Sequence, residues 1–398
     1  MPIIPLVEPS PRSIAAPPCF ALFALGFRPF YLLAAALALV IVPAWVLMLT
    51  GWLPGPAGLP ALYWHGHEMI FGFAVAVIVG FLFTAAQSWT GRPTPTGSAL
   101  LGLACVWLAG RIALLCAPPL VAAVIDLLFL PAAALMLARV LIGAGSRRNY
   151  FVLVILAGLT GSNALMHVAL LGWIAASPLL GLHLACAIIA TLCTVIAGRI
   201  VPSFTANALR TQPWRHPGLD RAAISFTAAA LFAWALGVAS PWTGSLAAVA
   251  FILQCVRCNG WRPWVCARTP LLWILHLSHG WLLVGLAWLA LASLGVLPIA
   301  SMLHLITLGC ISGLIIAMIT RTSLGHTGRK LVAGPVETAC YGLMQLALLA
   351  RVLPPLLLPE HYQAGLVVSA LAWVICFGLY LYRYAPMLWY SRVDGKPG

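Results

Sequence analysis

Charged side chains are scarce in this sequence of 398 residues: only 7% are Asp, Glu, Lys or Arg, whereas 63% are hydrophobic and the mean hydropathy is +1.04. A soluble domain carries about 25% charged residues. A surface with so few charges is poorly hydrated. The composition therefore excludes an ordinary soluble domain and predicts that a lipid bilayer surrounds most of the chain.

Acidic side chains are scarcer than basic ones. Seven Asp and Glu stand against 21 Lys and Arg, which gives a formal net charge of +14. The basic residues do not form the single patch that nucleic-acid binding requires; they recur in short clusters in alternate connections between apolar runs. This pattern follows the positive-inside rule and predicts that both termini are cytoplasmic. Arg111 and Arg351 depart from the rule, because they fall on the side poor in Lys and Arg.

Two cysteine patterns are also missing. There is no CxxCH sequence for covalent attachment of haem, and most of the 11 cysteines lie within apolar runs, where a thiol behaves as a small apolar group. Any haem would therefore be held non-covalently, and the sequence gives no sign of an extracellular disulfide framework.

Apolar runs long enough to cross a bilayer make up most of the chain. A bilayer core takes about 20 residues of helix, so 398 residues have room for about twelve spans with their connections. We expect an all-α polytopic protein, a single integral membrane domain over residues 1–398 with short cytoplasmic tails at 1–20 and 387–398. The predicted spans cover residues 29–50, 65–88, 98–117, 119–142, 149–172, 178–200, 221–239, 242–259, 270–293, 299–320, 333–353 and 362–385.

An internal repeat is visible in the spacing of arginines and histidines. Arg28, Arg148 and Arg268 precede the first, fifth and ninth predicted helices at intervals of 120 residues (148 − 28 and 268 − 148). The second, sixth and tenth helices each carry a histidine at a similar distance before a threonine near the cytoplasmic end. That distance is 23 residues from His67 to Thr90, 22 from His183 to Thr205, and 23 from His304 to Thr327. We predict three pseudo-repeated four-helix units, at about residues 21–145, 146–262 and 263–386.

The histidines gather in one half of the predicted membrane. At a helical rise of 1.5 Å per residue, His183 and His304 lie about 24–26 Å from Arg199 and Arg321, the arginines that end their helices. His65 and His67 open the second helix at the far side, and His167 ends the fifth. Ionisable groups inside a membrane bundle mark functional sites by default, although any single histidine can instead make a hydrogen bond between packed helices.

Imidazole is a good ligand for iron, copper and zinc, and an axial ligand of haem. His276 and His279, three residues apart on one face of the ninth helix, are further candidates. Glu68 follows His67 directly, so it would orient that imidazole or take up protons. Only two other carboxylates, Asp126 and Glu337, fall in or beside the predicted spans. A proton-coupled transporter usually needs a relay of carboxylates, so the sequence gives little support for one.

Polar, turn-prone stretches at residues 198–202 and 320–329 are expected to form loops on the cytoplasmic side. They carry Arg199, Arg321 and His326. These arginines either pair with haem propionates or an anionic substrate, or anchor helix ends to lipid phosphates and set the topology.

Several of these segments resemble the NnrS family, from the first helix to the connection after the tenth. The segments are Phe23-Ala24-Leu25-Gly26-Phe27-Arg28-Pro29-Phe30, Trp64-His65-Gly66-His67-Glu68-Met69, Trp89-Thr90-Gly91-Arg92-Pro93, Gly198-Arg199-Ile200-Val201-Pro202-Ser203-Phe204-Thr205 and Thr320-Arg321-Thr322-Ser323-Leu324-Gly325-His326-Thr327-Gly328-Arg329. The resemblance implies a bacterial inner-membrane protein that contains haem and copper and is associated with denitrification and resistance to nitric oxide. Its histidine motifs fall on His65, His67, His276, His279, His304 and His326.

A weaker resemblance links the chain to haem–copper oxidases and nitric oxide reductases. Their catalytic subunit has twelve helices in three groups of four, a haem between histidines of the second and tenth helices, and a copper ligand on the sixth. Here those helices carry His65 and His67, His304, and His183. The adjacent His-His pair of their seventh helix is missing, and His276 and His279 are the candidates to replace it.

The leading hypothesis is a haem b and copper membrane protein that binds, detoxifies or reduces nitric oxide. It would be an oxidoreductase if it turns over, with a quinol or a cytochrome as electron donor. His65 or His67 with His304 would be the axial haem ligands, and His183, His276, His279 and His167 the candidate metal ligands. Two alternatives stay open: a transporter of a metal, haem or small anion, and a non-catalytic haem-based sensor or protector of the iron pool.

Overall fold

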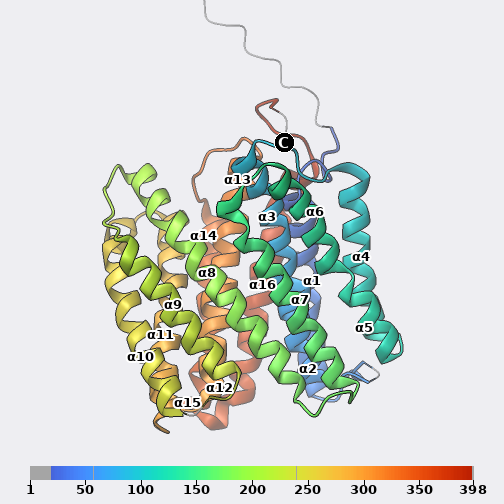
Figure 1. The fold of residues 1–398 in the computed structure, drawn as a ribbon, viewed down its shortest axis with the longest axis vertical. Helices are drawn as coiled ribbons and strands as arrows, with labels where there is room; N and C mark the ends of the chain where they lie inside the picture. Colours follow the sequence, from blue (N-terminus) through green and yellow to red (C-terminus); the bar gives the residue numbers. More distant parts are fainter. Residues whose placement is uncertain (1–18, 57, 239, 397–398) are drawn as a thin grey trace, which may run out of the picture.

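Long helices run side by side through the molecule (Figure 1). The computed structural model describes residues 19–56, 58–238 and 240–396, and every named element in those ranges is helical. Most of the predicted tail 1–20 lies outside the described residues. The C-terminus lies at one end of the bundle, while α2 (Ala61–His67), α12 (Ile299–His304) and α15 (Pro354–Leu357) lie toward the other.

Ten helical segments in the described ranges are long and apolar enough to cross a membrane. Four are single helices: α1 (Phe27–Leu49), α4 (Gly97–Cys116), α8 (Pro178–Leu209) and α11 (Pro270–Ser293). Six are composite: α2 with η1 (Glu68–Ala74) and α3 (Val75–Thr90); α5 (Pro119–Leu127) with α6 (Phe129–Gly143); η2 (Arg147–Asn149) with α7 (Phe151–Leu170); α12 with η4 (Leu305–Ser312) and α13 (Gly313–His326); α14 (Pro335–Val352) with α15; and η5 (Pro359–His361) with α16 (Tyr362–Trp389). The prediction of an all-helical, multi-pass membrane protein is confirmed.

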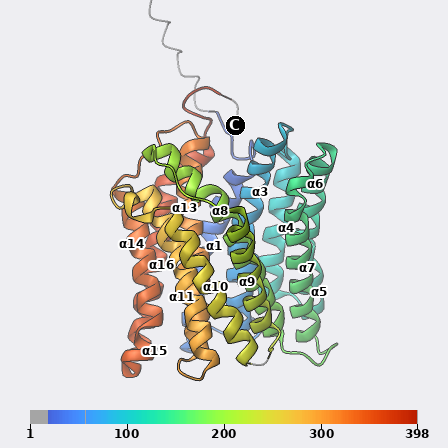
Figure 2. The ribbon, with the colours of Figure 1, turned by 60° about the vertical axis from the view of Figure 1, so that its left-hand side comes forward.

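Two further helices, α9 (Pro217–Ala235) and α10 (Ser240–Gly260), are not among the ten. They are more polar, and their polar side chains bind each other: the Arg257 Nε donates to Asp220 Oδ1 at 2.7 Å, and the Gln254 amide donates to Thr227 Oγ1 at 3.0 Å. α9 packs on α8 and α10 packs on α11, as Figure 2 also shows. The count of twelve spans and the three-unit repeat stay predictions.

The loops expected at residues 198–202 and 320–329 are largely helical, so that prediction is wrong. α8 continues to Leu209 and α13 continues to His326, with the turn coming only after it. Packing explains the difference: the Arg321 guanidinium lies 4.1 Å from the centre of the Phe204 ring, and the Thr320 and Tyr341 hydroxyls are 2.7 Å apart. These contacts between helices outweigh the local turn preference.

Two of the composite helices widen to π geometry directly after a histidine. η1 begins after His67, and η4 begins after His304. π segments are rare, and they are frequently found at functional sites. α8 lies between these two segments and contacts α2 and η1 on one side and η4 on the other. The second, sixth and tenth predicted helices are therefore neighbours.

A buried arginine joins the first and last helices. Arg28 in α1 is fully buried, and its guanidinium donates to the carbonyl oxygens of Leu388 at 3.0 Å and Tyr390 at 2.7 Å. These carbonyls at the end of α16 have no partner within the helix, so the guanidinium supplies one.

The variant Gly198→Ala tests whether the contact of Arg257 in α10 with the backbone of α8 stabilises the fold. Arg257 donates to the Thr194 carbonyl at 3.2 Å, and a Cβ atom at Gly198 would overlap its guanidinium. We expect Gly198→Ala to lower the thermal unfolding midpoint in detergent, because overpacking costs about 1–3 kcal/mol. Gly161→Ala is the matched control, since a Cβ there meets nothing within 4 Å. Equal midpoints for the two variants would show that this contact does not hold the helices together.

Candidate functional site

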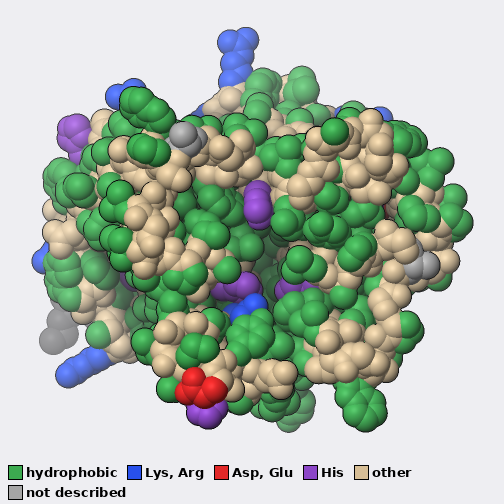
Figure 3. All heavy atoms as spheres, turned by 90° about the horizontal axis from the view of Figure 1, so that it is seen from below, with side chains coloured by type: hydrophobic (Ala, Val, Ile, Leu, Met, Phe, Trp, Pro, Cys, Tyr) green, Lys and Arg blue, Asp and Glu red, His purple; other side chains and the backbone are tan. Residues whose placement is uncertain are grey.

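A cavity of about 200 Å³ opens among the helices at the end away from the C-terminus. Figure 3 shows this face with a central hollow, in which histidine and Lys or Arg side chains are visible. The polar lining includes His65 from α2, His183 from α8, His304 from α12 and Arg351 from α14. The rest of the wall is mostly apolar and comes from α1, η1, η4 and α16 as well. Three histidines predicted as ligands are thus brought to one cavity from distant parts of the chain.

The cavity histidines are held by their surroundings. His304 Nδ1 lies 3.4 Å from the Ala300 carbonyl oxygen, which can only accept, so Nδ1 carries the hydrogen and Nε2 of the neutral ring keeps its lone pair. The His65 ring stacks on Trp45 with centroids 4.1 Å apart, and its buried Nδ1 has no hydrogen-bond partner among the residues that the structure describes. The His183 ring lies 4.4 Å from Trp234.

The chemistry of this wall suits an apolar ligand that carries a metal atom and an anionic group. Fixed imidazoles offer nitrogen lone pairs, Arg351 offers a positive charge, and the lining residues include no Asp or Glu. A bare divalent cation would find no counter-charge there. The residues therefore fit a non-covalently held haem better than they fit a simple ion.

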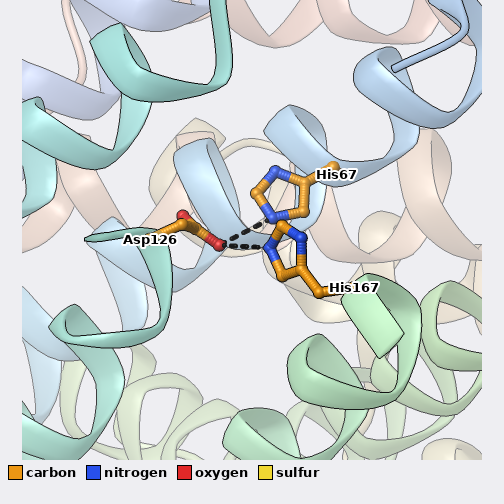
Figure 4. Close-up of side chains that lie close together, drawn as sticks. All are labelled: His67, Asp126 and His167. Carbon is orange, nitrogen blue, oxygen red and sulfur yellow. Dashed lines mark hydrogen bonds and ion pairs between the residues drawn. The ribbon is translucent and has the colours of Figure 1, made fainter. Parts of the chain in front are cut away.

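His67 and His167 form a second group, and Figure 4 shows both rings directed toward Asp126. His67 Nε2 is 3.0 Å from Asp126 Oδ2, and His167 Nε2 is 3.1 Å from the same oxygen. All three side chains are buried, and their donor atoms are close enough to hold a metal ion. His67 comes from α2, Asp126 from α5 and His167 from α7. We call this group, with Glu68, Arg111 and Asn163, the polar cluster.

Both ring nitrogens of His67 face carboxylates. Nδ1 lies 3.4 Å from Glu68 Oε1, while Nε2 lies 3.0 Å from Asp126 Oδ2. A neutral imidazole has only one N–H, so it can satisfy only one of these contacts. A metal ion on Nε2 would resolve the conflict, because Nδ1–H could then donate to Glu68 in the carboxylate–histidine–metal arrangement.

The polar cluster has a net negative charge that a cation could balance. Arg111 pairs with Glu68 Oε2 at 3.3 Å and with Asp126 Oδ1, and the Asn163 amide donates to Asp126 Oδ2 at 2.7 Å. Two carboxylates and one guanidinium leave one negative charge when the histidines are neutral. An uncompensated charge in a buried site is costly, so the cluster is complete only with one more cation, a metal ion or a proton.

Local structure explains how Asp126 reaches this cluster. Pro131 has no N–H to donate to the Leu127 carbonyl, and the helix is interrupted at Leu128, between α5 and α6. Asp126 stands next to this break. Gly72 leaves space for the pair of Glu68 and Arg111. An added Cβ there would lie 2.6 Å from Glu68 Oε2 and 2.9 Å from the Arg111 guanidinium.

The remaining predicted residues lie elsewhere. His276 Nε2 is 3.1 Å from Thr205 Oγ1, and His279 Nε2 is 3.5 Å from Gln254 Oε1, so the two face α8 and α10. Neither lines the cavity nor joins the polar cluster. The structure therefore does not bring them together with His183, and their role as metal ligands stays a prediction.

The residues that the sequence predicts at a cytoplasmic side lie away from the cavity lining. The Arg199 guanidinium lies 4.7 Å from the centre of the Phe151 ring, and the His326 ring lies 5.5 Å from the Phe27 ring. Like Arg321 over Phe204, both pack helices against each other.

Three site residues are not predicted from the sequence: Asp126, Arg111 and Arg351. The available signals were an aspartate within an apolar helix and two arginines that break the positive-inside pattern. Each of these charges proves to be placed at one of the two histidine sites.

These features define a multi-pass helical membrane protein with two histidine sites inside its bundle. The chain belongs to the NnrS family, because the family model described as NnrS protein matches residues 21–392, nearly all of it. A search of curated proteins finds no match. Family membership fits a role in the nitric oxide response.

Asp126→Asn tests whether the extra cation of the polar cluster is a metal. We expect most of the transition metal bound per chain at this site to be lost, because both histidines share the carboxylate that is removed. Glu68→Gln should keep the metal but weaken its affinity by about 10–100-fold, as changes beside a ligating histidine do. The measurement is metal content and metal titration of purified protein, with His361→Gln, an exposed histidine, as control. Unchanged metal content in Asp126→Asn would identify the cation as a proton.

Proposed function

We propose that the protein binds haem b in the cavity, copper at the polar cluster, and nitric oxide at the haem. The observation that carries this proposal is that His65 and His304, from helices far apart in the sequence, line the same apolar cavity. His65 and His304 would hold the haem iron, and His183 would provide a third imidazole in the same cavity.

Haem supplies an iron atom that binds nitric oxide; the protein supplies access and environment. Nitric oxide is small and uncharged, so it partitions into lipid and can enter an apolar cavity. The wall is mostly apolar, and its polar groups include Arg351 and the imidazoles. Trp45 and the Ala300 carbonyl hold two of the histidine rings in place.

Copper at the polar cluster is supported by the donor set. Two imidazole nitrogens and one carboxylate oxygen suit Cu(II). Glu68 would orient His67, and Arg111 would hold both carboxylates. The helix turn that carries His65 and His67 would thus connect the two metal sites.

Turnover makes further demands. Reduction of two NO to N2O and water consumes two electrons and two protons, so catalysis needs an electron donor such as a quinol or a cytochrome. The non-catalytic alternative, a sensor or a protector of the iron pool, needs none. The two are separated by whether N2O forms when purified protein is mixed with nitric oxide and a reductant.

We propose an inner-membrane location with both termini cytoplasmic. Basic side chains such as Arg199, Arg329 and Arg392 belong to the end of the bundle that carries the C-terminus, and the positive-inside rule assigns this end to the cytoplasm. The cavity would then open toward the periplasmic side.

A transporter is the second candidate, because the cavity is open toward one end of the bundle (Figure 3). It predicts flux of a metal, haem or small anion into sealed vesicles and no tightly held cofactor.

His304→Ala tests the haem proposal. Purified wild-type protein should show a b-type spectrum when reduced with dithionite, and nitric oxide should change it. The variant should lose that spectrum, because it would lack one of the residues that hold the haem, whereas His361→Ala should keep it. Full haem content in His304→Ala would remove His304 from the ligand set. A wild-type protein that stays silent after reconstitution with haem would favour transport.

A further inference from the structure

We infer that Arg351 is an anion-binding residue of the cavity, which recognises a carboxylate or a small oxyanion. Arg351 lies in the last turn of α14, is half-buried, and lines the same cavity as His65, His183 and His304. It is a basic side chain in a wall that is otherwise mostly apolar.

Arg351 has no protein acceptor in the part of the chain that the structure describes. Its guanidinium lies 5.4 Å from the centre of the Tyr362 ring, and no described carboxylate pairs with it. Arg111 and Arg257, by contrast, pair with carboxylates: Arg111 with Glu68 and Asp126, and Arg257 with Asp220. A cation in an apolar wall without a partner is unfavourable, so this wall is suited to an anion that enters from outside.

The position of Arg351 in the bundle strengthens this inference. A cation in the last turn of a helix interacts favourably with the helix dipole, but a side chain turned to the surface would achieve the same. Arg351 instead faces the space that the imidazoles face. Arg351 also falls on the side of the predicted membrane that is otherwise poor in Lys and Arg. The positive-inside rule therefore does not account for a basic residue at this position.

The chemistry of the ligand follows from the guanidinium. Its planar fork of N–H groups matches two oxygens of a carboxylate or of a planar oxyanion. Two sources share this chemistry: a propionate of bound haem, which rests on the proposed function, and a free small anion such as nitrite.

The test compares Arg351→Gln with wild type in the full chain purified without haem, which is titrated with protohaem IX and with its dimethyl ester. If the anion is a propionate, Gln should weaken protohaem binding about 10-fold, because a charge-assisted hydrogen bond is lost. Binding of the ester, which has no carboxylate, should not change. Arg268→Gln, at an exposed arginine before α11, is the matched control and should behave as wild type.

A second arm uses nitrite alone on the same haem-free protein. If the anion is free, wild type binds nitrite, Arg351→Gln loses that binding, and protohaem affinity is unchanged. Arg351→Lys keeps the charge and should retain more anion affinity than Gln. The thermal unfolding midpoint of each variant detects misfolding. If Arg351→Gln does not fold, the comparison of Arg351→Lys with wild type decides the outcome.

Two results with the Arg351→Gln variant would overturn the inference. One is equal weakening of protohaem and ester binding by Arg351→Gln with no effect on nitrite, which would make the role structural. The other is wild-type affinity for both anions in the variant. A wild type that binds neither protohaem nor its ester would contradict the proposed haem site. The nitrite arm would then decide the role of Arg351 by itself, and absence of nitrite binding would overturn the inference.

Discussion

A charge buried inside this bundle needs a partner from the protein or from a bound ligand, because lipid offers none. The polar cluster shows this constraint most clearly. Arg111 on α4 pairs with Glu68 on η1 and with Asp126 on α5, and Asp126 also binds His67 on α2 and His167 on α7. One network thus fixes four neighbouring spans, and it still lacks one positive charge. The same contacts that hold the helices create a site for a cation.

That network also sets the orientation of α2. Residues two apart in a helix point to nearly opposite sides, so fixing His67 in the polar cluster turns His65 toward the cavity. The π segment that begins at Glu68 follows directly, and a second one follows His304. Across the cavity, His183 and Arg351 complete a wall in which nitrogen donors and one cation interrupt an apolar surface. Two sites of different character therefore share one helix turn.

Hydropathy and charge alternation were sufficient to predict the helical membrane class, since both depend on composition over about 20 residues. Histidines on the second, sixth and tenth predicted helices pointed to the cavity. What the sequence could not give was pairing between helices. Asp126 becomes a partner of His67 only through the packing of α5 and α7 on α2. The residues 320–326 stay helical because Arg321 and Thr320 find Phe204 and Tyr341, partners distant in sequence.

We propose that the cavity holds a haem and the polar cluster a metal ion. A cryo-electron microscopy map of the full chain, purified with its native ligands, can show both groups. We expect flat non-protein density bounded by His65, His304 and Arg351, and a compact peak joined to His67, Asp126 and His167. A map with only lipid or solvent in the cavity, from a sample that was never stripped of haem, would contradict this proposal.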